Sequence, residues 1–425
     1  MTRRGPIALI AAVASLALVA SACGSGNGAS SGSTAPIDVG AVYPLTGPDR
    51  AGGLEELRGV RLATDLVNAS GGVDGRQVRL HAVDTPTTDA LPGAIAGFRS
   101  DGIQVVLGSN GSELSDSAAT DAFDAGMVYW ETGAVGEMSG DASGRLAFKV
   151  APSGLVLGSS GIAFIVDQMA SRLHRDPASL RFVVVNVDDR YGATVADGAL
   201  QEIAKRHLTL AGRFRYGVTN FDPAPLVRRI EAARPDVLFV ASYIPDGVAL
   251  NRELVRQRVP LLANIGTSSS YCMPEFGDEL GPMAVGTFAT DKPDGESLNE
   301  QGLTPEGRDL LHRAQQGFRS QYHEDMSAPA LAGFSAAWAL LHDVMPNASN
   351  LDADAIAHAA LGVRLPTGSL PNGSGLEFSG PGSPQPGSNL RALSVIWEWV
   401  GVRQRAVVWP PRYATTAIQA LPLAA

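Results

Sequence analysis

The chain has 425 residues, a formal net charge of −10 and a hydrophobic content of 45%. An acidic chain without a basic stripe argues against nucleic-acid binding. Only two cysteines are present, Cys23 and Cys272, so the fold cannot rest on a disulfide framework. The chain is longer than a single hydrophobic core usually organises, which predicts two lobes.

The N-terminal segment has the pattern of an export signal. Arg3 and Arg4 precede an apolar run over residues 7–19. This run is too short for a permanent membrane span, which takes roughly 20 apolar residues. Small residues then lead to Cys23, and the segment resembles a bacterial lipobox, although Ala20 stands where leucine is usual. The resemblance implies a signal peptide over residues 1–22 and a lipidated Cys23. The alternative is an ordinary signal peptide cut elsewhere.

The segment after the predicted cleavage site is a flexible tether. Residues 23–36 consist almost entirely of Gly, Ser, Ala, Asn and Thr, a composition that buries nothing and stays flexible. Beyond the leader, no segment is expected to reach transmembrane length.

From residue 37 onward, apolar strand-like runs alternate with amphipathic helical runs. The first series has expected strands at 37–42, 77–83, 103–107 and 127–130, and helices at 54–68 and 115–125. The second has helices at 155–172, 193–206, 223–233 and 248–257, and strands at 181–187, 210–216, 237–241 and 260–265. Helices at 305–322, 328–343 and 353–361 follow, then strands at 390–400 and 405–409. This alternation is typical of an α/β protein with parallel sheets and predicts two doubly wound lobes.

Several short motifs occur in a fixed order along the chain. They lie at 39–48, 59–63, 68–76, Asp84, 106–109, 189–192, 220–222, 234–236 and 375–378. In this order and spacing they resemble the leucine/isoleucine/valine-binding proteins, which are type I periplasmic binding proteins. The resemblance covers nearly the whole mature chain. It implies two doubly wound parallel-sheet lobes joined by three crossover segments, with a ligand trapped in the cleft when the lobes close.

Mapped onto this chain, the resemblance implies a division into lobes and a function. Lobe 1 is expected at 37–151 plus 289–375, lobe 2 at 152–288 plus 376–412, and a C-terminal tail at 413–425. The implied protein is a lipoprotein anchored on the extracytoplasmic face of the cell membrane, without catalysis or cofactor. It would trap a small polar solute, such as an amino acid or an amide, and deliver it to the permease of an ABC-type importer.

The first candidate site follows an apolar strand and precedes a helix. Its residues are Ser109, Asn110, Gly111 and Ser112. Backbone N–H groups and hydroxyls at a helix N-terminus suit a carboxylate or another oxygen-rich group. The resemblance places a ligand contact in this loop and puts Ser112 at the serine position of the family. The alternative is that Ser112 and Asn110 only cap the helix, and Glu113 is interpreted as structural.

The second candidate site follows the expected strand 127–130 and consists of Glu131, Thr132 and Gly133. Relatives that bind amino acids place a threonine hydroxyl in this loop, where this chain has Val135. The alternative for Glu131 is a solvated strand end. In the second lobe, the resemblance implies that Tyr191 covers the ligand, and Tyr243 follows a strand and is placed to do the same; packing is the alternative for both.

Two departures from the family pattern bear on the ligand. No carboxylate lies at 265–267, where amino-acid-binding relatives hold the ligand ammonium, and the tyrosine usual after Pro48 is missing. Glu131 is therefore predicted to line the pocket. Because a buried carboxylate without a partner is costly, the ligand is expected to carry hydrogen-bond donors, and aliphatic amino acids are expected to bind poorly.

Other functions were weighed on the same residues. A ligand-sensing receptor of the same fold, coupled to a membrane signalling partner, remains open. A cell-envelope hydrolase would need a nucleophile–base pair, and the Gly-x-Ser-x-Gly pattern at 28–32 lies in the tether, outside the strand–turn–helix context that such a nucleophile requires. The seven histidines show no metal-ligand spacing. Cys272 is predicted to be a small packing residue.

Overall fold

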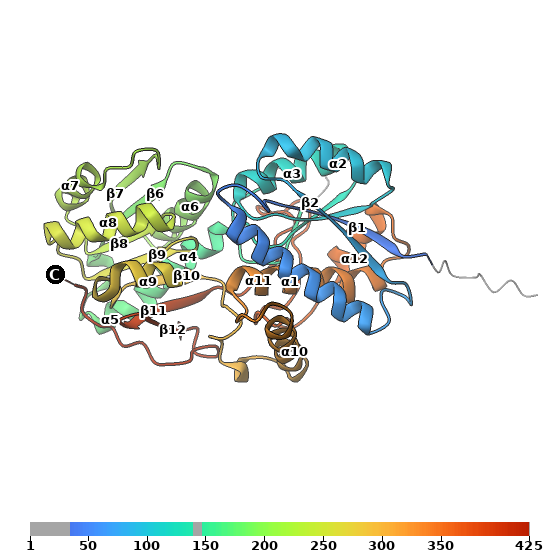
Figure 1. The fold of residues 1–425 in the computed structure, drawn as a ribbon. Coiled ribbons are helices and arrows are strands. Elements are labelled where there is room, and N and C mark those ends of the chain that lie inside the picture. The colour runs from blue at the N-terminus through green and yellow to red at the C-terminus, as the bar shows by residue number, and fades with distance from the viewer. Residues whose placement is uncertain (1–34, 139–146, 425) are drawn as a thin grey trace, which may run out of the picture. The chain divides into compact units, whose positions relative to one another are not determined.

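A computed structural model describes residues 35–138 and 147–424. The predicted signal peptide, Cys23 and nearly all of the tether lie outside the described residues. Within the described part of the chain, the strands form one five-stranded and one seven-stranded sheet. Figure 1 shows each sheet with helices packed around it, the blue N-terminal elements on one sheet and the green and yellow elements on the other. The expected α/β fold with two mostly parallel sheets is confirmed.

The first sheet has the strand order β2-β1-β3-β4-β5, and all of its recorded pairs are parallel. Its strands are β1 (Ile37–Tyr43), β2 (Val78–Asp84), β3 (Val105–Gly108), β4 (Val128–Glu131) and β5 (Ala147–Lys149). Its N-terminal helices are α1 (Arg50–Ala69), α2 (Leu91–Ser100) and α3 (Ser112–Asp124). β3 and β4 are buried along their whole length, as expected for strands covered by helices on both faces.

The second sheet has the order β12-β11-β10-β9-β8-β6-β7. Its strands are β6 (Arg181–Val187), β7 (Thr209–Tyr216), β8 (Val237–Ala241), β9 (Ala263–Thr267), β10 (Phe288–Asp291), β11 (Val395–Gly401) and β12 (Gln404–Trp409). The last two strands pair antiparallel, and the others are parallel. Its helices are α6 (Arg190–Lys205), α7 (Pro223–Ala233), α8 (Ile244–Gln257) and α9 (Pro274–Leu280).

No segment beyond the leader was expected to reach transmembrane length, but one helical run of the second lobe does reach it. α4 (Gly154–Phe164) continues through a π-helical turn (Ile165–Met169) into α5 (Ala170–Arg172). By length and composition alone, these 19 residues could cross a membrane. Half of the apolar window is buried inside the structure, where α4 packs against α6 and β10. Core helices of globular proteins meet the same criterion, and the burial indicates that role here.

The chain returns to the first lobe after β10. α10 (Pro305–Tyr322), α11 (Ala328–Trp338) and α12 (Ala353–Gly362) follow in sequence. α11 lies along α1, and α10 and α12 contact α1 and β4 respectively. Figure 1 shows these orange helices beside the blue N-terminal elements. Segments more than 200 residues apart in sequence therefore build one lobe.

Two expected lobe boundaries are wrong in detail. The boundary at 288/289 falls inside β10, which pairs with both β9 and β11, so the chain leaves the second sheet after Asp291. Residues from 376 onward were expected in lobe 2. Instead, the Phe378 ring lies 5.3 Å from Trp130 and 5.0 Å from Phe148. Ser388 forms a bridge with Lys149 of β5. The chain reaches the second sheet again only at β11, because the aromatic cluster of the first lobe holds this segment.

The C-terminal residues run along the second sheet. The Thr415 N–H donates to the carbonyl of Val407 at 2.8 Å. The Gln419 N–H donates to Glu398 Oε2 at 2.8 Å.

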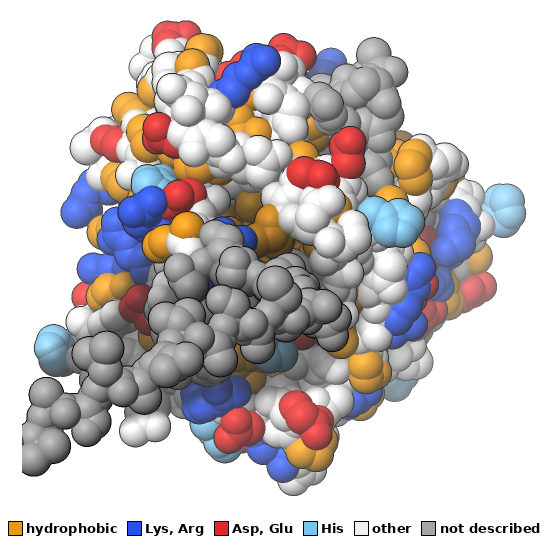
Figure 2. Space-filling view, turned by 90° about the vertical axis from the view of Figure 1, so that its right-hand side faces the viewer, with side chains coloured by type: hydrophobic (Ala, Val, Ile, Leu, Met, Phe, Trp, Pro, Cys, Tyr) orange, Lys and Arg blue, Asp and Glu red, His pale blue; other side chains and the backbone are white. Residues whose placement is uncertain are grey.

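The surface is mixed in charge: on the visible part of the face in Figure 2, acidic and basic side chains lie interspersed with hydrophobic ones.

Candidate ligand-binding pocket

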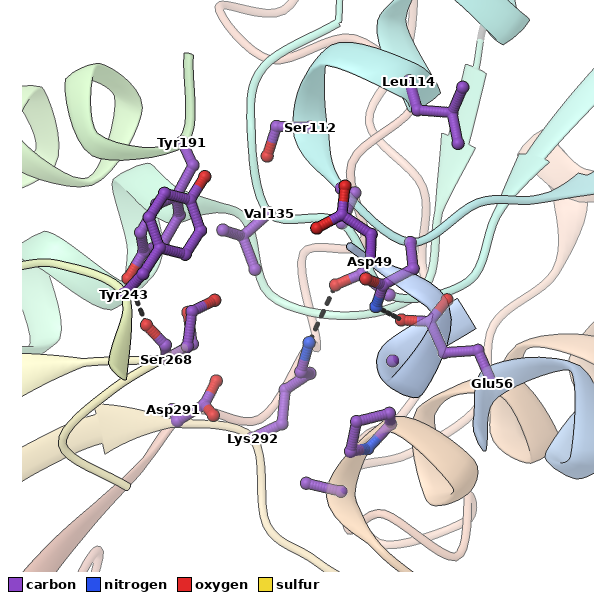
Figure 3. Close-up of a pocket in the computed structure, with 18 of the residues that line it drawn as sticks. Asp49, Glu56, Ser112, Leu114, Val135, Tyr191, Tyr243, Ser268, Asp291 and Lys292 are labelled. Carbon is purple, nitrogen blue, oxygen red and sulfur yellow. Dashed lines mark hydrogen bonds between the residues drawn. The ribbon is translucent and has the colours of Figure 1, made fainter. Parts of the chain in front are cut away.

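A pocket of about 280 Å³ is lined by residues that follow strands of both sheets. The first lobe contributes the loops after β3 and β4, the start of α1 and the start of α11. The second lobe contributes the loops after β8 and β9, the start of α6 and the end of β10. In open α/β sheets the carboxyl ends of parallel strands leave such a crevice for a ligand. The labelled side chains in Figure 3 converge on it from both sides.

The loop after β3 presents the start of α3 to the pocket. Asn110, Gly111 and Ser112 all line the cavity. The expectation that Asn110 or Ser112 caps α3 is wrong: the cap position is Gly111, with φ 91°, and no side chain caps this end. The Asn110 amide instead donates to Glu56 Oε1 at 2.9 Å, and Ser112 Oγ accepts from the Gly136 N–H at 3.0 Å. The positive end of the α3 dipole therefore meets the pocket without a side-chain cap.

Three of the predicted site residues lie behind the pocket wall. Ser109, Glu131 and Thr132 are fully buried and are not among the residues that line the cavity. The Ser109 hydroxyl lies 3.1 Å from that of Ser115. The Thr132 hydroxyl bonds to Tyr43 Oη at 2.8 Å and to Glu56 Oε2 at 2.9 Å. These side chains hold the loops that form the wall.

Glu131 shapes the loop after β4. Its Oε1 accepts from the N–H groups of Gly133 at 2.8 Å and of Ala134 at 2.7 Å. Burial raises the pKa of its carboxyl group, against the attraction of Lys149 and these hydrogen bonds. The side chain folds back under Gly133, Ala134 and Val135, which line the pocket. The structure therefore does not bear out a pocket-lining Glu131.

Glu56 is a pocket residue that the sequence analysis did not identify. It lies on the buried face of α1 with Leu57 and Val60, is 1% exposed and lines the cavity. Burial raises the pKa of its carboxyl group to about 8, although Lys292, Asn110 and Thr132 act in the opposite direction. The sequence does contain a signal for this residue. Glu56 lies one position before Leu57 and four before Val60, on the apolar face expected for the helix, so a buried glutamate could have been predicted there.

Two tyrosines form part of the second-lobe wall. The rings of Tyr191 and Tyr243 lie 5.3 Å apart at 41°. Tyr191 is buried, and its hydroxyl bonds to Thr267 Oγ1 at 2.8 Å and to the Ser268 carbonyl. The Tyr243 hydroxyl donates to Asp189 Oδ2 at 2.7 Å. Both rings line the pocket, while their hydroxyls are used to hold the rings in place.

Polar atoms without a partner also lie on the second-lobe wall. Asp291 is the last residue of β10 and is 3% exposed. Its Oδ2 accepts from Cys272 Sγ at 2.9 Å, whereas its Oδ1 and the hydroxyl of Ser268 have no hydrogen-bond partner within the described residues. Burial raises the pKa of the Asp291 carboxyl group, and Lys292 opposes this. Both residues line the cavity, so the pocket contains unsatisfied acceptors.

Asp291 lies beside the position where a carboxylate was sought on β9. Thr290 of β10 pairs with Thr267 of β9, so the next residue, Asp291, lies next to the end of β9. No acid stands at 265–267, and the neighbouring strand β10 carries one instead. A long-range strand pairing of this kind leaves no local sequence signal.

Lys292 is the basic residue among the described pocket-lining residues. It is 9% exposed, and its Nζ donates to the carbonyl of Gly133 at 2.8 Å. Figure 3 shows the side chain pointing from the second-lobe side into the space between Asp291 and Glu56. The chain has three lysines, Lys149, Lys205 and Lys292, and the burial of Lys292 could not be read from that scarcity alone.

The described residues contain no group of three or more His, Cys, Asp or Glu side chains that could hold a metal ion. The pocket can instead bind through hydrogen bonds and charge: carboxylate and hydroxyl acceptors, one ammonium group, an uncapped helix end and two aromatic rings.

Comparison with known proteins assigns the chain to a family. The family described as periplasmic binding protein matches residues 36–380. A Leu/Ile/Val-binding protein homolog 8 of Brucella abortus (strain 2308) is 23% identical over 368 residues, which cover 86% of this chain and 88% of that protein. Homolog 7 of the same strain is 24% identical over 368 residues, covering 86% of this chain and 90% of its own length.

Solved structures show the same fold. A putative branched-chain amino acid ABC transporter protein from Silicibacter pomeroyi has a TM-score of 0.73 at 17% identity, covering 91% of this chain and 100% of that chain. A leucine-, isoleucine-, valine-, threonine- and alanine-binding protein from Brucella ovis, in a closed conformation, has a TM-score of 0.72 at 14% identity, covering 88% and 94%.

The two sheets with a shared pocket thus have the fold of the type I periplasmic binding proteins. The chain belongs to the periplasmic binding protein family, and the two relatives named above are Leu/Ile/Val-binding protein homologs. A solute-binding role and an extracytoplasmic location follow from this membership.

Proposed function

We propose that this protein is a lipid-anchored receptor that traps one small polar solute between its lobes and delivers it to an ABC-type permease. The observation that carries the proposal is the set of unpartnered polar groups in the pocket. On one wall, Asp291 Oδ1 and the Ser268 hydroxyl have no hydrogen-bond partner among the described residues. On the other wall, the backbone N–H groups at the start of α3 have no side-chain cap. Leaving a buried polar group unpaired costs about 1–3 kcal/mol, which a ligand with matching groups recovers.

The pocket also explains why binding would be coupled to lobe closure. A ligand that bonds to Asp291 and to the start of α3 contacts both lobes at once. It therefore binds the closed arrangement more tightly than any arrangement with the lobes apart, and shifts the population toward closure. The relatives named as branched-chain amino acid transporter proteins support delivery to a permease in this case as well.

The test begins with the purified protein. Mass spectrometry of the supernatant after denaturation identifies the solute that copurifies. Adding it back at a hundredfold excess over its Kd should stabilise the fold by roughly 2.7 kcal/mol and reduce the radius of gyration in solution scattering. The variant Asp291→Ala should lose most of both effects. Stabilisation without compaction would contradict a trap formed by two lobes.

Delivery needs a separate measurement. The ligand-loaded protein should stimulate the ATPase activity of its permease in proteoliposomes, whereas the ligand-free protein should do so weakly. Equal inactivity of both forms, with ligand binding intact, would favour the alternative of a receptor that reports to a signalling partner.

A further inference from the structure

The pocket already contains a cation that belongs to the chain. Lys292 Nζ donates to the Gly133 carbonyl at 2.8 Å. For the buried carboxyl groups of Glu56 and Asp291, Lys292 is the charge that most strongly favours the ionised form. This one ammonium group extends from the end of β10 to the loop after β4, and its charge acts to lower the pKa of one acid on each wall.

This arrangement fills the place where a cationic ligand group would bind. A ligand ammonium group would donate hydrogen bonds to carbonyl and carboxylate oxygens, and in this pocket Gly133, Glu56 and Asp291 supply them. Gly133 already accepts a hydrogen bond from Lys292, and the charge of Lys292 already acts to lower the pKa of both carboxyl groups. A second ammonium group would add a like charge within a mostly buried cavity, where charges interact more strongly than in water.

The groups that remain define what the ligand must supply. A lysine ammonium has three N–H donors, and the described residues record one hydrogen bond for Lys292 Nζ. The start of α3, without a side-chain cap, adds further positive potential on the facing wall. These donors call for an oxyanion. Asp291 Oδ1 and the Ser268 hydroxyl are nine-tenths buried or more and have no partner among residues 35–138 and 147–424. They can accept a hydrogen bond from a neutral donor such as a hydroxyl group.

We propose that the ligand is a small carboxylic acid without an ammonium group and with a hydroxyl donor, as in a 2-hydroxy acid, and that Lys292 stands in for the amino group of an amino acid. The inference rests on the proposed function, because it assumes that this pocket is where the solute is trapped. The ligand carboxylate bonds to Lys292 Nζ and the α3 N-terminus, and its hydroxyl donates to Asp291. The apolar side chain then lies against Val135 and Met273, which also line the cavity.

Matched pairs of ligands test the proposal, since each pair differs only in a hydroxyl or an ammonium group. The probes are lactate with alanine, 2-hydroxy-4-methylpentanoate with leucine, and malate with aspartate, each titrated calorimetrically into protein that has been unfolded and refolded to remove bound solute. We expect at least one hydroxy acid to bind, about tenfold or more tightly than its amino acid partner, which corresponds to about 1.4 kcal/mol.

The variant Lys292→Met tests the role of the side chain. It should lower the affinity for the hydroxy acid at least tenfold. It should also remove or reverse the preference for the hydroxy acid over its amino acid partner. Lys205→Met is the matched control, because its side chain is 75% exposed and pairs with Glu202 at 3.2 Å on α6. It should leave both affinities unchanged. Thermal unfolding without ligand checks that the two variants are folded.

Three results would overturn the inference. The first is tighter binding of the amino acid in each pair that binds. The second is a hydroxy-acid affinity that Lys292→Met does not change. The third is no binding by any of the six probes. In each case, compaction of the protein with another solute would leave the proposed trap intact. If no solute reduced the radius of gyration, the trap itself would be contradicted.

Discussion

At the scale of single residues, the pocket depends on where buried protons and charges lie. Glu56 has a raised pKa of about 8 because its carboxyl group is removed from water. Its two oxygens are held by the Asn110 amide and the Thr132 hydroxyl. At neutral pH the group is mostly protonated, so it adds little negative charge to the pocket. The charge of the pocket is thus more balanced than a count of its acids indicates.

A pH dependence of stability follows from Glu56. Its ordinary value of 4.5 applies to the unfolded chain, and the native value is about 8. Between these values the native state binds a proton that the unfolded state has released. The free energy of unfolding therefore falls as pH rises through this window, by up to about 1.4 kcal/mol per pH unit, and the loss levels off above pH 8. Below pH 4.5 the full contribution is present.

Glu56→Gln checks this dependence, because glutamine imitates the protonated side chain. Urea unfolding of the wild type and the variant at several values between pH 5 and pH 8 should give a difference in stability that changes steadily in favour of the variant. Other buried acids titrate in both proteins and cancel in the difference. Parallel stability curves would mean that Glu56 is ionised throughout.

Glu131 has a structural role that its substitution should reveal. Glu131→Ala removes the acceptor of two buried N–H groups, those of Gly133 and Ala134. Each unsatisfied donor costs about 1–3 kcal/mol, so a clear fall in melting temperature is expected, with a smaller one for Glu131→Gln, which keeps an acceptor oxygen. A fully stable Glu131→Ala protein that fails to bind ligand would instead place this side chain in the pocket.

Pocket residues that could be predicted from sequence are placed by local pattern, whereas those that were missed are placed by tertiary structure. Asn110, Ser112 and Gly133 line the pocket and come directly after strands, where local pattern is informative. Glu131 follows the same rule, but the loop after it folds back over its side chain. Asp291 and Lys292 were missed because their position depends on the pairing of β9 with β10, which no local pattern encodes.

At the scale of elements, glycines allow helices in each lobe to pack at close range. A Cβ on Gly59 of α1 would lie 1.9 Å from the carbonyl oxygen of Ala330 on α11, and one on Gly333 would lie 2.2 Å from that of Glu56. In the second lobe, Gly158 of α4 and Gly198 of α6 face each other's backbone in the same way. The first of these contacts fixes α1, and with it the position of Glu56 in the pocket.

Gly59→Ala should therefore destabilise the protein, by at least about 1–3 kcal/mol as overpacking does, because backbone atoms of α11 cannot move aside as a side chain would. Gly97→Ala on the exposed side of α2 is the control. No atom lies within 4 Å of its added Cβ, and replacing a helix glycine should stabilise by about 0.5–1 kcal/mol. Urea unfolding measures both, and equal effects would show that α1 and α11 do not pack as closely as described.

Strongly periodic elements were predictable from sequence, and short or glycine-containing ones were not. The helices at 223–233 and 305–322 and the strands at 181–187 and 237–241 have the predicted bounds. α2 was missed because Gly93 and Gly97 weaken its helical pattern, and β5 because it has three residues. The lobe boundary near 376 failed for a different reason: the contact of Phe378 with Trp130 is tertiary.

At the scale of the whole molecule, the chain passes between the lobes three times within the described residues. It crosses after β5, after β10 and before β11. Lys149 at the first crossing donates to the Gly136 carbonyl, and Lys292 follows the second. Both lysines are buried and lie close to crossing segments, and Lys292 also lines the pocket. Relative movement of the lobes would change the Lys292–Gly133 contact, which links the proposed ligand group to closure.

The proposed attachment of the molecule to a membrane depends on Cys23, which lies outside the described residues. One acyl chain gives only marginal membrane binding, whereas a diacylglycerol group supplies two chains and a stable anchor. Cys23→Ala in a bacterial host should leave the precursor uncleaved or release the protein from the membrane fraction, because the residue that accepts the lipid is gone. Cys272→Ala is the matched control: Cys272 is buried beside Asp291, so its loss should not alter fractionation. Fractionation and intact mass both unchanged for Cys23→Ala would contradict the lipid anchor and favour an ordinary signal peptide.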